Sequence, residues 1–326
     1  MLDWLSKAMK RPDEVEIIKL FQRRFGKKSR FVAEDLEILK LANTTFAVKS
    51  DMLVQSTDVP PGMRLQEISR KSLAACVSDF SCKGIKPIYA TIALSIPRGF
   101  SLREVNELAD GFARSSREFG VQLVGGDVNE GKEIIIEVSM FGVGKKIPRR
   151  GDAKVGDIIV TSGPFGYCLA GLKIISGKTS ANAQFTKKCK EKVFKPTPRL
   201  EFGLKAAKYF SSSMDSSDGL SITLNDMNKQ SKKRFVITNL PVENDVVSYA
   251  KKNKISLYDI VFCGGEEYEI VATVPCKNLQ KVKNLAKRSK IRLYEIGYVT
   301  CGTKVVHVEE NTERVVRRCG WIHLRS

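Results

Sequence analysis

Residues 145–162 read KKIPRRGDAKVGDIIVTS and divide the sequence into two parts of similar length. The segment before Ile158 is rich in charge, proline and glycine, a composition typical of a connection between folded units. The apolar run IIVTS at 158–162 predicts the first strand of a second unit. We therefore expect two domains, residues 1–150 and residues 151–326, which suits a chain of 326 residues.

Strands and helices alternate in the first expected domain. An amphipathic pattern with basic residues over 1–30 predicts a leading helix. Apolar runs predict strands at 46–56, 87–97, 121–128 and 133–144, with helices at 63–84 and 101–120 between them. The second of these helices begins with Ser101 and Glu104 as a capping box, and Gly120 ends it.

The second expected domain repeats this alternation. Strands are predicted at 158–162, 234–239, 268–274, 293–300 and 304–308, and helices near 166–176, near 198–211 and after Asp218. Strands that alternate with helices indicate a mixed α/β (α+β) fold class. No internal repeat or low-complexity tract interrupts the pattern.

The composition is that of an ordinary globular protein, with 42% hydrophobic and 28% charged residues. No apolar run approaches the roughly 18 residues that a membrane-spanning helix needs, so no membrane span is expected. The N-terminal segment MLDWLSKAMKRPDEVEII is charged throughout and lacks the apolar stretch of a signal peptide. We therefore expect a cytoplasmic protein.

The net charge of +19 is the unusual bulk property of the chain. It is compatible with a nucleic-acid partner, with attraction of phosphorylated ligands, or with an intracellular medium of high ionic strength. Aromatic residues do not interleave with the dispersed lysines as they do in single-strand binding surfaces. This pattern disfavours a nucleic-acid partner.

The chain contains eight cysteines, none in a C-x-x-C pair, and only two histidines. This combination disfavours a zinc site. Disulfides are rare in cytoplasmic proteins, so we expect the cysteines to be reduced and mostly to be small core residues.

Five aspartates stand beside small residues where a strand or helix ends: Asp51 in KSDML, Asp79 in VSDFSCKG, Asp127 in VGGDVNEG, and Asp215 and Asp218 in MDSSDGLS. Their carboxylate oxygens suit Mg²⁺, a hard cation that retains waters and takes phosphate oxygens as further ligands. Each aspartate alone is better explained as a helix cap or turn residue. MDSSDGLS differs, because two carboxylates there meet a predicted helix N-terminus, where free N–H groups favour phosphate.

Two glycine-containing stretches add weaker indications. TSGPFGYCLAGL at 161–172 places glycines between a strand and a helix, where backbone can approach a phosphate, but it is neither a P-loop nor a dinucleotide-binding fingerprint. CGGEEYEIV at 263–271 places Glu266, Glu267 and Tyr268 after a Gly-Gly turn. The alternative interpretation of this stretch is a strand start with solvated glutamates.

The motifs SDML, VSDFSCKGIKP, LVGGDV, GD-IIVTSG-FG with AGL, KPTPR, MDSSDGL, GGEEYE and a terminal GW follow one another between about residue 31 and residue 323. In this order they resemble the thiamine-monophosphate kinase family, for which MDSSDGL and GGEEYE are the most specific. The form SDMLVQSTDVPPGM is similar to the archaeal branch of that family. Aminoimidazole-ribonucleotide synthetase and selenophosphate synthetase share the general plan.

The resemblance implies a two-domain aminoimidazole-ribonucleotide synthetase-like fold. In that fold the N-terminal sheets of two subunits form a barrel across a homodimer interface, and ATP lies between the domains. The implied reaction is ATP- and Mg²⁺-dependent phosphorylation of thiamine monophosphate to thiamine diphosphate by direct in-line transfer. No catalytic general base is expected, because the acceptor phosphate is already anionic; several magnesium ions would position the two phosphate chains.

The resemblance also implies site residues. Magnesium ligands are expected at Glu34, Ser50, Asp51, Asp79, Asp127, Asp215 and Asp218. ATP contacts are expected at Gly126, Asp127, Arg150 and Ser217. Contacts to the acceptor are expected at Asp58, Glu266 and Trp321. The Trp321 indole would stack on a thiamine ring, and core packing is the alternative for it.

Three positions depart from the family pattern. The early Gly-Asp-Asp motif appears as Ala33-Glu34-Asp35, which would make Glu34 the first metal ligand. Lys49 replaces a small hydroxyl residue, and Asp58 stands where many bacterial members carry histidine. Two alternatives to the kinase are another synthetase of the superfamily, of selenophosphate or aminoimidazole-ribonucleotide type, and a basic RNA-binding protein on a retired enzyme scaffold.

Overall fold

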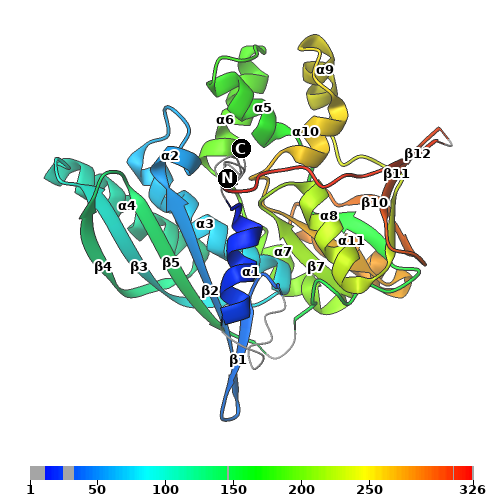
Figure 1. Cartoon of the computed structure of the whole chain (residues 1–326), viewed down its shortest axis with the longest axis horizontal. Coiled ribbons are helices and arrows are strands. Elements are labelled where there is room, and N and C mark those ends of the chain that lie inside the picture. Colours follow the sequence, from blue (N-terminus) through cyan, green and yellow to red (C-terminus); the bar gives the residue numbers. More distant parts are fainter. Residues whose placement is uncertain (1–11, 25–32, 145–146, 311, 325–326) are drawn as a thin grey trace, which may run out of the picture.

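The computed structural model describes residues 12–24, 33–144, 147–310 and 312–324, which form two β-sheets with helices packed around them (Figure 1). The first sheet lies at the left of Figure 1, the second at the right, and helix α3 (Leu65–Lys83) lies between them. The expected leading helix is α1 (Glu14–Arg24), shorter than the 1–30 predicted, and the rest of that prediction falls outside the described residues.

The first sheet has five strands in the order β1-β2-β5-β3-β4. Their bounds are β1 (Glu37–Leu41), β2 (Thr44–Val54), β3 (Pro87–Pro97), β4 (Gln122–Gly131) and β5 (Ile135–Val143). Strands β3 and β4 pair in parallel, and the other neighbours pair antiparallel. Helices α3 and α4 (Leu102–Phe119) pack against this sheet, and the short α2 (Gln55–Asp58) follows β2.

The strands of the first sheet have one face in the core and one face outside it. On β5, Ile136, Val138 and Met140 are fully buried, whereas the alternate residues Glu137 and Ser139 are only partly covered. This period of two is the one expected for a sheet with a single buried face. The side chains of this sheet therefore divide into a core face and an open face.

The second sheet has seven strands in the order β12-β11-β8-β10-β6-β9-β7. Its strands are β6 (Ile158–Thr161), β7 (Ser212–Ser216), β8 (Arg234–Ile237), β9 (Glu269–Val274), β10 (Tyr294–Thr300), β11 (Val305–Glu309) and β12 (Thr312–Val315). Its helices are α5 (Tyr167–Ile175), α6 (Ala183–Phe194), α7 (Leu200–Ala206), the 3₁₀ turn η1 (Ala207–Tyr209), α8 (Leu220–Ser231), α9 (Asn244–Lys252), α10 (Leu257–Cys263) and α11 (Cys276–Arg288).

Helix α3 joins the two halves, because it contacts β2 and β5 of the first sheet and α7, β7 and β9 of the second half. Its C-terminal turn approaches α7 so closely that a Cβ on Gly203 would lie 1.9 Å from the Ser81 carbonyl oxygen. The Ser213 hydroxyl of β7 also donates to the Cys82 carbonyl at 2.6 Å. Backbone of one half thus lies directly against backbone of the other. The boundary at residue 150 stays a prediction; it falls between Val143 of β5 and Ile158 of β6.

Most predicted elements are confirmed to within a few residues, including the Ser101–Glu104 capping box and the left-handed Gly120 at the end of α4. The prediction missed β1, β7, β12, α2, α6, α9, α10 and α11. Asp215 was expected at a helix start but lies in β7. The segment SSSMDSS has too few apolar or β-branched residues to indicate a strand, yet all five residues of β7 are buried.

The expectation for the cysteines was wrong in one respect. Cys263 and Cys319, 56 residues apart in the sequence, form a disulfide. Spacing could not reveal this pair, because it arises where the C-terminal segment folds back beside α10. Of the other six, Cys76, Cys82, Cys168 and Cys189 are buried as expected, whereas Cys276 and Cys301 are exposed. Across the described ranges, no helix is both long and apolar enough to cross a membrane.

We predict that Gly203→Ala destabilises the protein by about 2 kcal/mol, since the added methyl group would overlap the Ser81 carbonyl and force α3 away from α7. The matched control is Leu204→Ala on the same helix, where the side chain is 37% exposed. Thermal unfolding of both variants gives the comparison. An unchanged midpoint for Gly203→Ala would show that the α3–α7 contact is not tight.

Candidate active site

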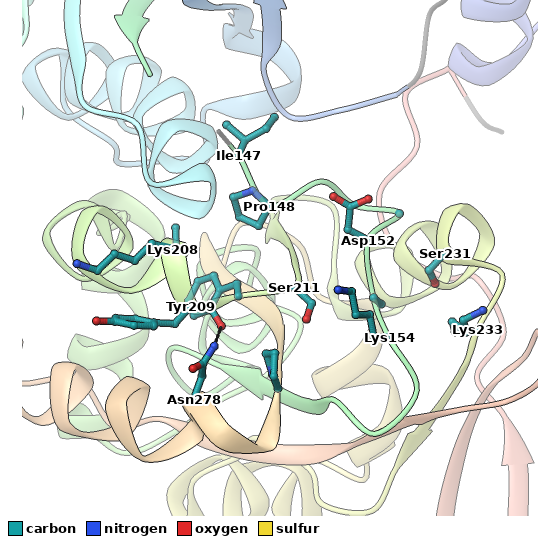
Figure 2. Close-up of a pocket in the computed structure, with 15 residues that line it drawn as sticks. Ile147, Pro148, Asp152, Lys154, Lys208, Tyr209, Ser211, Ser231, Lys233 and Asn278 are labelled. Carbon is teal, nitrogen blue, oxygen red and sulfur yellow. Dashed lines mark hydrogen bonds between the residues drawn. The ribbon is translucent and has the colours of Figure 1, made fainter. Parts of the chain in front are cut away.

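A cleft of about 670 Å³ lies between the two halves. Its walls come from β2, the loop after α2, helix α3, the β7–α8 turn, the loop 263–268 and the C-terminal segment. A second hollow, of about 690 Å³, lies near the linker and is shown in Figure 2. Of the described residues, Lys154, Lys208 and Lys233 line that hollow, and Asp152 is the only acidic one among the described lining residues. Carboxylates gather in the cleft instead, which makes the cleft the candidate site.

Three buried aspartates form a cluster, and two of them, Asp79 and Asp215, line the cleft. Asp35, Asp79 and Asp215 each offer a carboxylate oxygen, and these oxygens lie within 4.8 Å of one another. Asp35 precedes β1, Asp79 lies on α3, and Asp215 lies on β7. The cluster therefore combines both halves of the chain. Its donor set is the hard oxygen set that Mg²⁺ prefers.

Basic groups surround these carboxylates. Lys83 Nζ lies 2.8 Å from Asp35 Oδ2, and an Arg150 guanidinium nitrogen lies 2.5 Å from Asp35 Oδ1. On the cleft side, Lys49 Nζ lies 2.9 Å from Asp79 Oδ2. Asp35 and Asp79 thus each have a partner of opposite sign, whereas Asp215 accepts a hydrogen bond from the Ser78 hydroxyl at 2.7 Å.

The pKa values show which carboxylates lack compensation. Burial raises the pKa of Asp215 to about 7, and the negative charge of Asp35 adds to the shift. Burial also raises the pKa of Asp79, where Lys49 opposes the effect and the neighbouring aspartates add to it. Burial raises the pKa of Asp218 to about 6. At Asp35 burial acts in the same direction, but the charges of Lys83 and Arg150 hold its pKa below the ordinary value.

The cleft brings together most of the residues predicted from the sequence. Eight of them line it: Asp51, Asp58, Asp79, Asp215, Ser217, Asp218, Glu266 and Trp321. Five predicted residues do not line it: Glu34, Ser50, Gly126, Asp127 and Arg150. Strand alternation accounts for Ser50, ion pairs account for Glu34 and Arg150, and Gly126 and Asp127 lie on β4 away from the cleft.

Ser50 and Asp127 belong to the open face of the first sheet. Ser50 alternates with Asp51 on β2, so its hydroxyl points away from the cleft and hydrogen-bonds to Glu137, with Ser139 3.3 Å away. Asp127 is exposed on β4, the terminal strand of the sheet. Its neighbour Gly126 lies against β3, where a Cβ would come 1.9 Å from the Ile92 carbonyl oxygen.

Glu34 is held outside the aspartate cluster. Its carboxylate accepts from Lys83 Nζ at 2.8 Å and from the backbone N–H of Arg150 at 3.1 Å. The next residue, Asp35, occupies the cluster instead. Sequence reasoning chose Glu34 and missed both Asp35 and Lys83. The signal available was the position of Lys83 one helical turn after Asp79, which places both side chains on one face of α3.

The loop 263–268 is held by buried carboxylates rather than solvated ones. Glu267 accepts from the N–H groups of Gly166 and Cys168 at 2.6 and 3.0 Å, so it fixes the start of α5. Glu269 is buried and forms an ion pair with Arg199. The interpretation of these glutamates as solvated was therefore wrong for both. Glu266 differs, because it reaches the cleft and pairs with Lys71.

Comparison with known proteins gives a consistent result. The family model described as AIR synthase related protein, N-terminal domain, matches residues 33–144. A Nitrosopumilus maritimus protein named thiamine-monophosphate kinase is 47% identical over 317 residues, covering 97% of this chain and 100% of that protein. A protein of the same name from Pyrococcus horikoshii is 31% identical, with 96% of each chain covered.

The fold also matches a solved structure. The structure described as AaThiL complexed with AMPPCP and TMP superimposes with a TM-score of 0.84 at 23% identity, covering 96% of this chain and 97% of that one. At this identity the match establishes the fold. The mixed α/β architecture expected from the sequence is thereby confirmed.

We predict that Asp215→Asn stabilises the metal-free protein at pH 8 by roughly 1 to 3 kcal/mol, the usual scale for an uncompensated buried polar group. The folded-state pKa of about 7 lies above the ordinary value of 3.8, so the wild type loses stability as pH rises from 3.8 to about 7. Asparagine cannot ionise, and the gain should vanish near pH 4.

Thermal unfolding in EDTA across this pH range is the measurement, with the exposed Asp259→Asn as the matched control. If Asp215→Asn raised the unfolding midpoint equally at pH 4 and at pH 8, ionisation of Asp215 would not be the cause of the stability difference.

Proposed function

The chain belongs to the thiamine-monophosphate kinase family, and on this premise we propose that the cleft is the place where ATP phosphorylates thiamine monophosphate to thiamine diphosphate. The protein is an ATP-dependent kinase of this type. The observation that carries the assignment of the cleft is the meeting of Asp35, Asp79 and Asp215 from both halves of the chain. Phosphoryl transfer depends on this kind of positioned charge rather than on covalent chemistry.

Magnesium fits the residues of the cleft. The three clustered aspartates offer only carboxylate oxygens, and the raised pKa values of Asp79 and Asp215 indicate uncompensated negative charge. Asp51 and Asp218 also line the cleft and would extend the donor set toward the substrates. When bound, magnesium ions neutralise the phosphate oxygens and bring them into line. We propose several such ions, and Asp35 in place of Glu34 among their ligands.

The residues of the chain contribute to the reaction by positioning the substrates. The acceptor phosphate is already anionic at neutral pH, so no side chain needs to remove a proton. His323 lines the cleft, but its imidazole lies 3.3 Å from Trp321 Nε1. Arg150 holds Asp35 in place; within the described residues its Nε is buried without a hydrogen-bond partner. The ATP contact expected for Arg150 remains part of the proposal.

The acceptor site is proposed at the wall formed by Asp58, Glu266 and Trp321. The thiazolium ring of thiamine is a cation, which a carboxylate and an indole face both attract. Trp321 is 51% exposed, so its ring is available for stacking. Lys71 holds the wall together, since it pairs with Glu266 and donates to the Asp58 carbonyl at 2.6 Å.

A homodimer is proposed from the first sheet. Its open face carries Met52, Tyr89 and Val143, which are 60%, 47% and 49% exposed. The terminal strand β4 leaves an unpaired edge, which proteins usually cover. Packing two such faces together would form the expected barrel. It would also give Asp127 a role, because Asp127 lies outside the cleft of its own chain and would complete the cleft of the partner.

The remaining parts of the proposal follow the sequence. The cytoplasmic location and the absence of a nucleic-acid partner remain expectations from composition. Attraction of phosphorylated substrates is compatible with the net charge of +19 and needs no nucleic acid. The related synthetases share the fold, and their substrates therefore serve as controls for the assay.

We predict that the protein converts thiamine monophosphate and ATP to thiamine diphosphate and ADP in the presence of Mg²⁺. Free thiamine and aminoimidazole precursors should give no product. Asp215→Asn and Asp127→Asn should each lower turnover by at least about 10³, because each removes charge that holds the metal. Chromatography of the products measures turnover, and circular dichroism shows whether each variant is folded. Near-normal turnover in both variants would contradict the metal assignment.

We predict that a mixed dimer of an Asp127→Asn chain and an Asp215→Asn chain regains roughly half of the wild-type activity, since one of its two symmetric sites is intact. Co-expression with two affinity tags isolates this dimer. The matched control pairs Asp215→Asn with Asp218→Asn, both in the cleft of one chain, and should stay inactive. An inactive Asp127/Asp215 mixed dimer would place Asp127 in its own site.

A further inference from the structure

The C-terminal segment after β12 returns across the molecule (Figure 1). Its residues Gly320, Trp321 and His323 line the cleft. The backbone N–H of Trp321 donates to the Asp218 carbonyl at 3.0 Å, and the backbone N–H of Cys319 donates to the Ser221 hydroxyl at 3.0 Å. Gly320 has φ of +140°, and a Cβ there would lie 2.2 Å from the Asp218 carbonyl oxygen. The segment therefore lies directly on the β7–α8 turn, with no room for a side chain between them.

The disulfide joins this segment to the loop 263–268. Cys263 ends α10 and is followed by Gly264, Gly265 and Glu266, while Cys319 precedes Gly320 and Trp321. The bridge thus connects the two segments that carry Glu266 and Trp321. Hydrogen bonds tie the C-terminal segment to α8 and its preceding turn, but only the disulfide links it covalently to the loop.

The loop needs such support, because its backbone is strained. Glu266 and Tyr268 have φ of 65° and 52°, in the left-handed region that side chains other than glycine rarely adopt. The Glu266 N–H donates to the Ser217 carbonyl at 2.5 Å, which ties the loop to the β7–α8 turn. The disulfide adds a second tie, from Cys263 to the C-terminal segment.

We propose that the Cys263–Cys319 disulfide positions Glu266 and Trp321 for binding of the acceptor, and that acceptor affinity changes with the thiol–disulfide state of this pair. This inference rests on the proposed function for the identity of the acceptor. In the reductive step a dithiol supplies two electrons and two protons. The S–S bond breaks to two thiols, and the dithiol becomes a disulfide.

Access and selectivity favour this bridge as the redox-responsive group. Cys263 lines the cleft, and Cys263 and Cys319 are both partly exposed, so a small dithiol can reach them. Four other cysteines are buried, and burial raises the pKa of Cys76, Cys82 and Cys168 far above the ordinary value. Those thiols are poor nucleophiles and should not exchange.

The kinetic test compares the oxidised protein with protein reduced by dithiothreitol. Reduction should raise KM for thiamine monophosphate by roughly tenfold, the scale expected when one or two ordered side chains become free, with kcat and KM for ATP nearly unchanged. Cys263→Ser, Cys319→Ser and the double variant should show the raised KM without reductant and no further response to it. The matched control is Cys301→Ser, which removes an exposed free thiol and should behave as the wild type.

Two readouts make the test independent of turnover. Alkylation before and after reduction, followed by peptide mass analysis, shows whether Cys263 and Cys319 are bridged in the purified protein. Hydrogen exchange of residues 263–268 and 316–324 should rise on reduction. If neither the oxidised nor the reduced protein phosphorylates thiamine monophosphate, the proposed function fails. Hydrogen exchange would still show whether the disulfide holds the loop and the C-terminal segment in place. A free pair of thiols, an unchanged KM, or equal losses for both substrates would each overturn the proposal.

Discussion

The buried ammonium of Lys83 is the interaction on which the arrangement of the two halves depends. Its side chain is fully buried, it pairs with Glu34 and Asp35, and it donates to the carbonyls of Pro148 and Ser213 at 3.0 and 2.8 Å. These partners come from the start of the first sheet, from the linker and from β7. A buried cation that lost them would be strongly destabilising, so the partners must stay together. The aspartate cluster is assembled around this fixed point.

The cluster itself is a local conflict between folding and function. Asp79 and Asp215 are buried close to Asp35, and the raised pKa values of the first two show that folding alone does not favour their ionised forms. Lys49 and Ser78 offset part of this conflict through contacts of 2.9 and 2.7 Å. A site that must load metal and phosphate needs such uncompensated charge. The surrounding structure, with Lys83 at its centre, keeps it in place.

The sequence predicted what local patterns specify. Apolar runs identified β3 and β5, and capping chemistry identified α4. Five aspartates were selected as a metal site, and four of them line the cleft. The remainder needed three-dimensional information: β7 is a strand because its neighbours bury it, and Ser50 faces away because strands alternate. Lys83 forms the ion pair that holds Asp35 in the cluster, and Cys263 meets Cys319 because the C-terminal segment folds back beside α10. Neither contact joins residues that are close in the sequence.

The contact between Gly203 and Ser81 has a consequence for the motions of the enzyme. Two helices whose backbones touch have no intervening layer of side chains that could slide or repack, so a hinge or shear movement at this point would break the contact outright. The contact therefore opposes any change in the angle between α3 and α7. Because α3 also carries Asp79, and β7 of the second half carries Asp215, the same contact keeps the spacing of these two carboxylates constant.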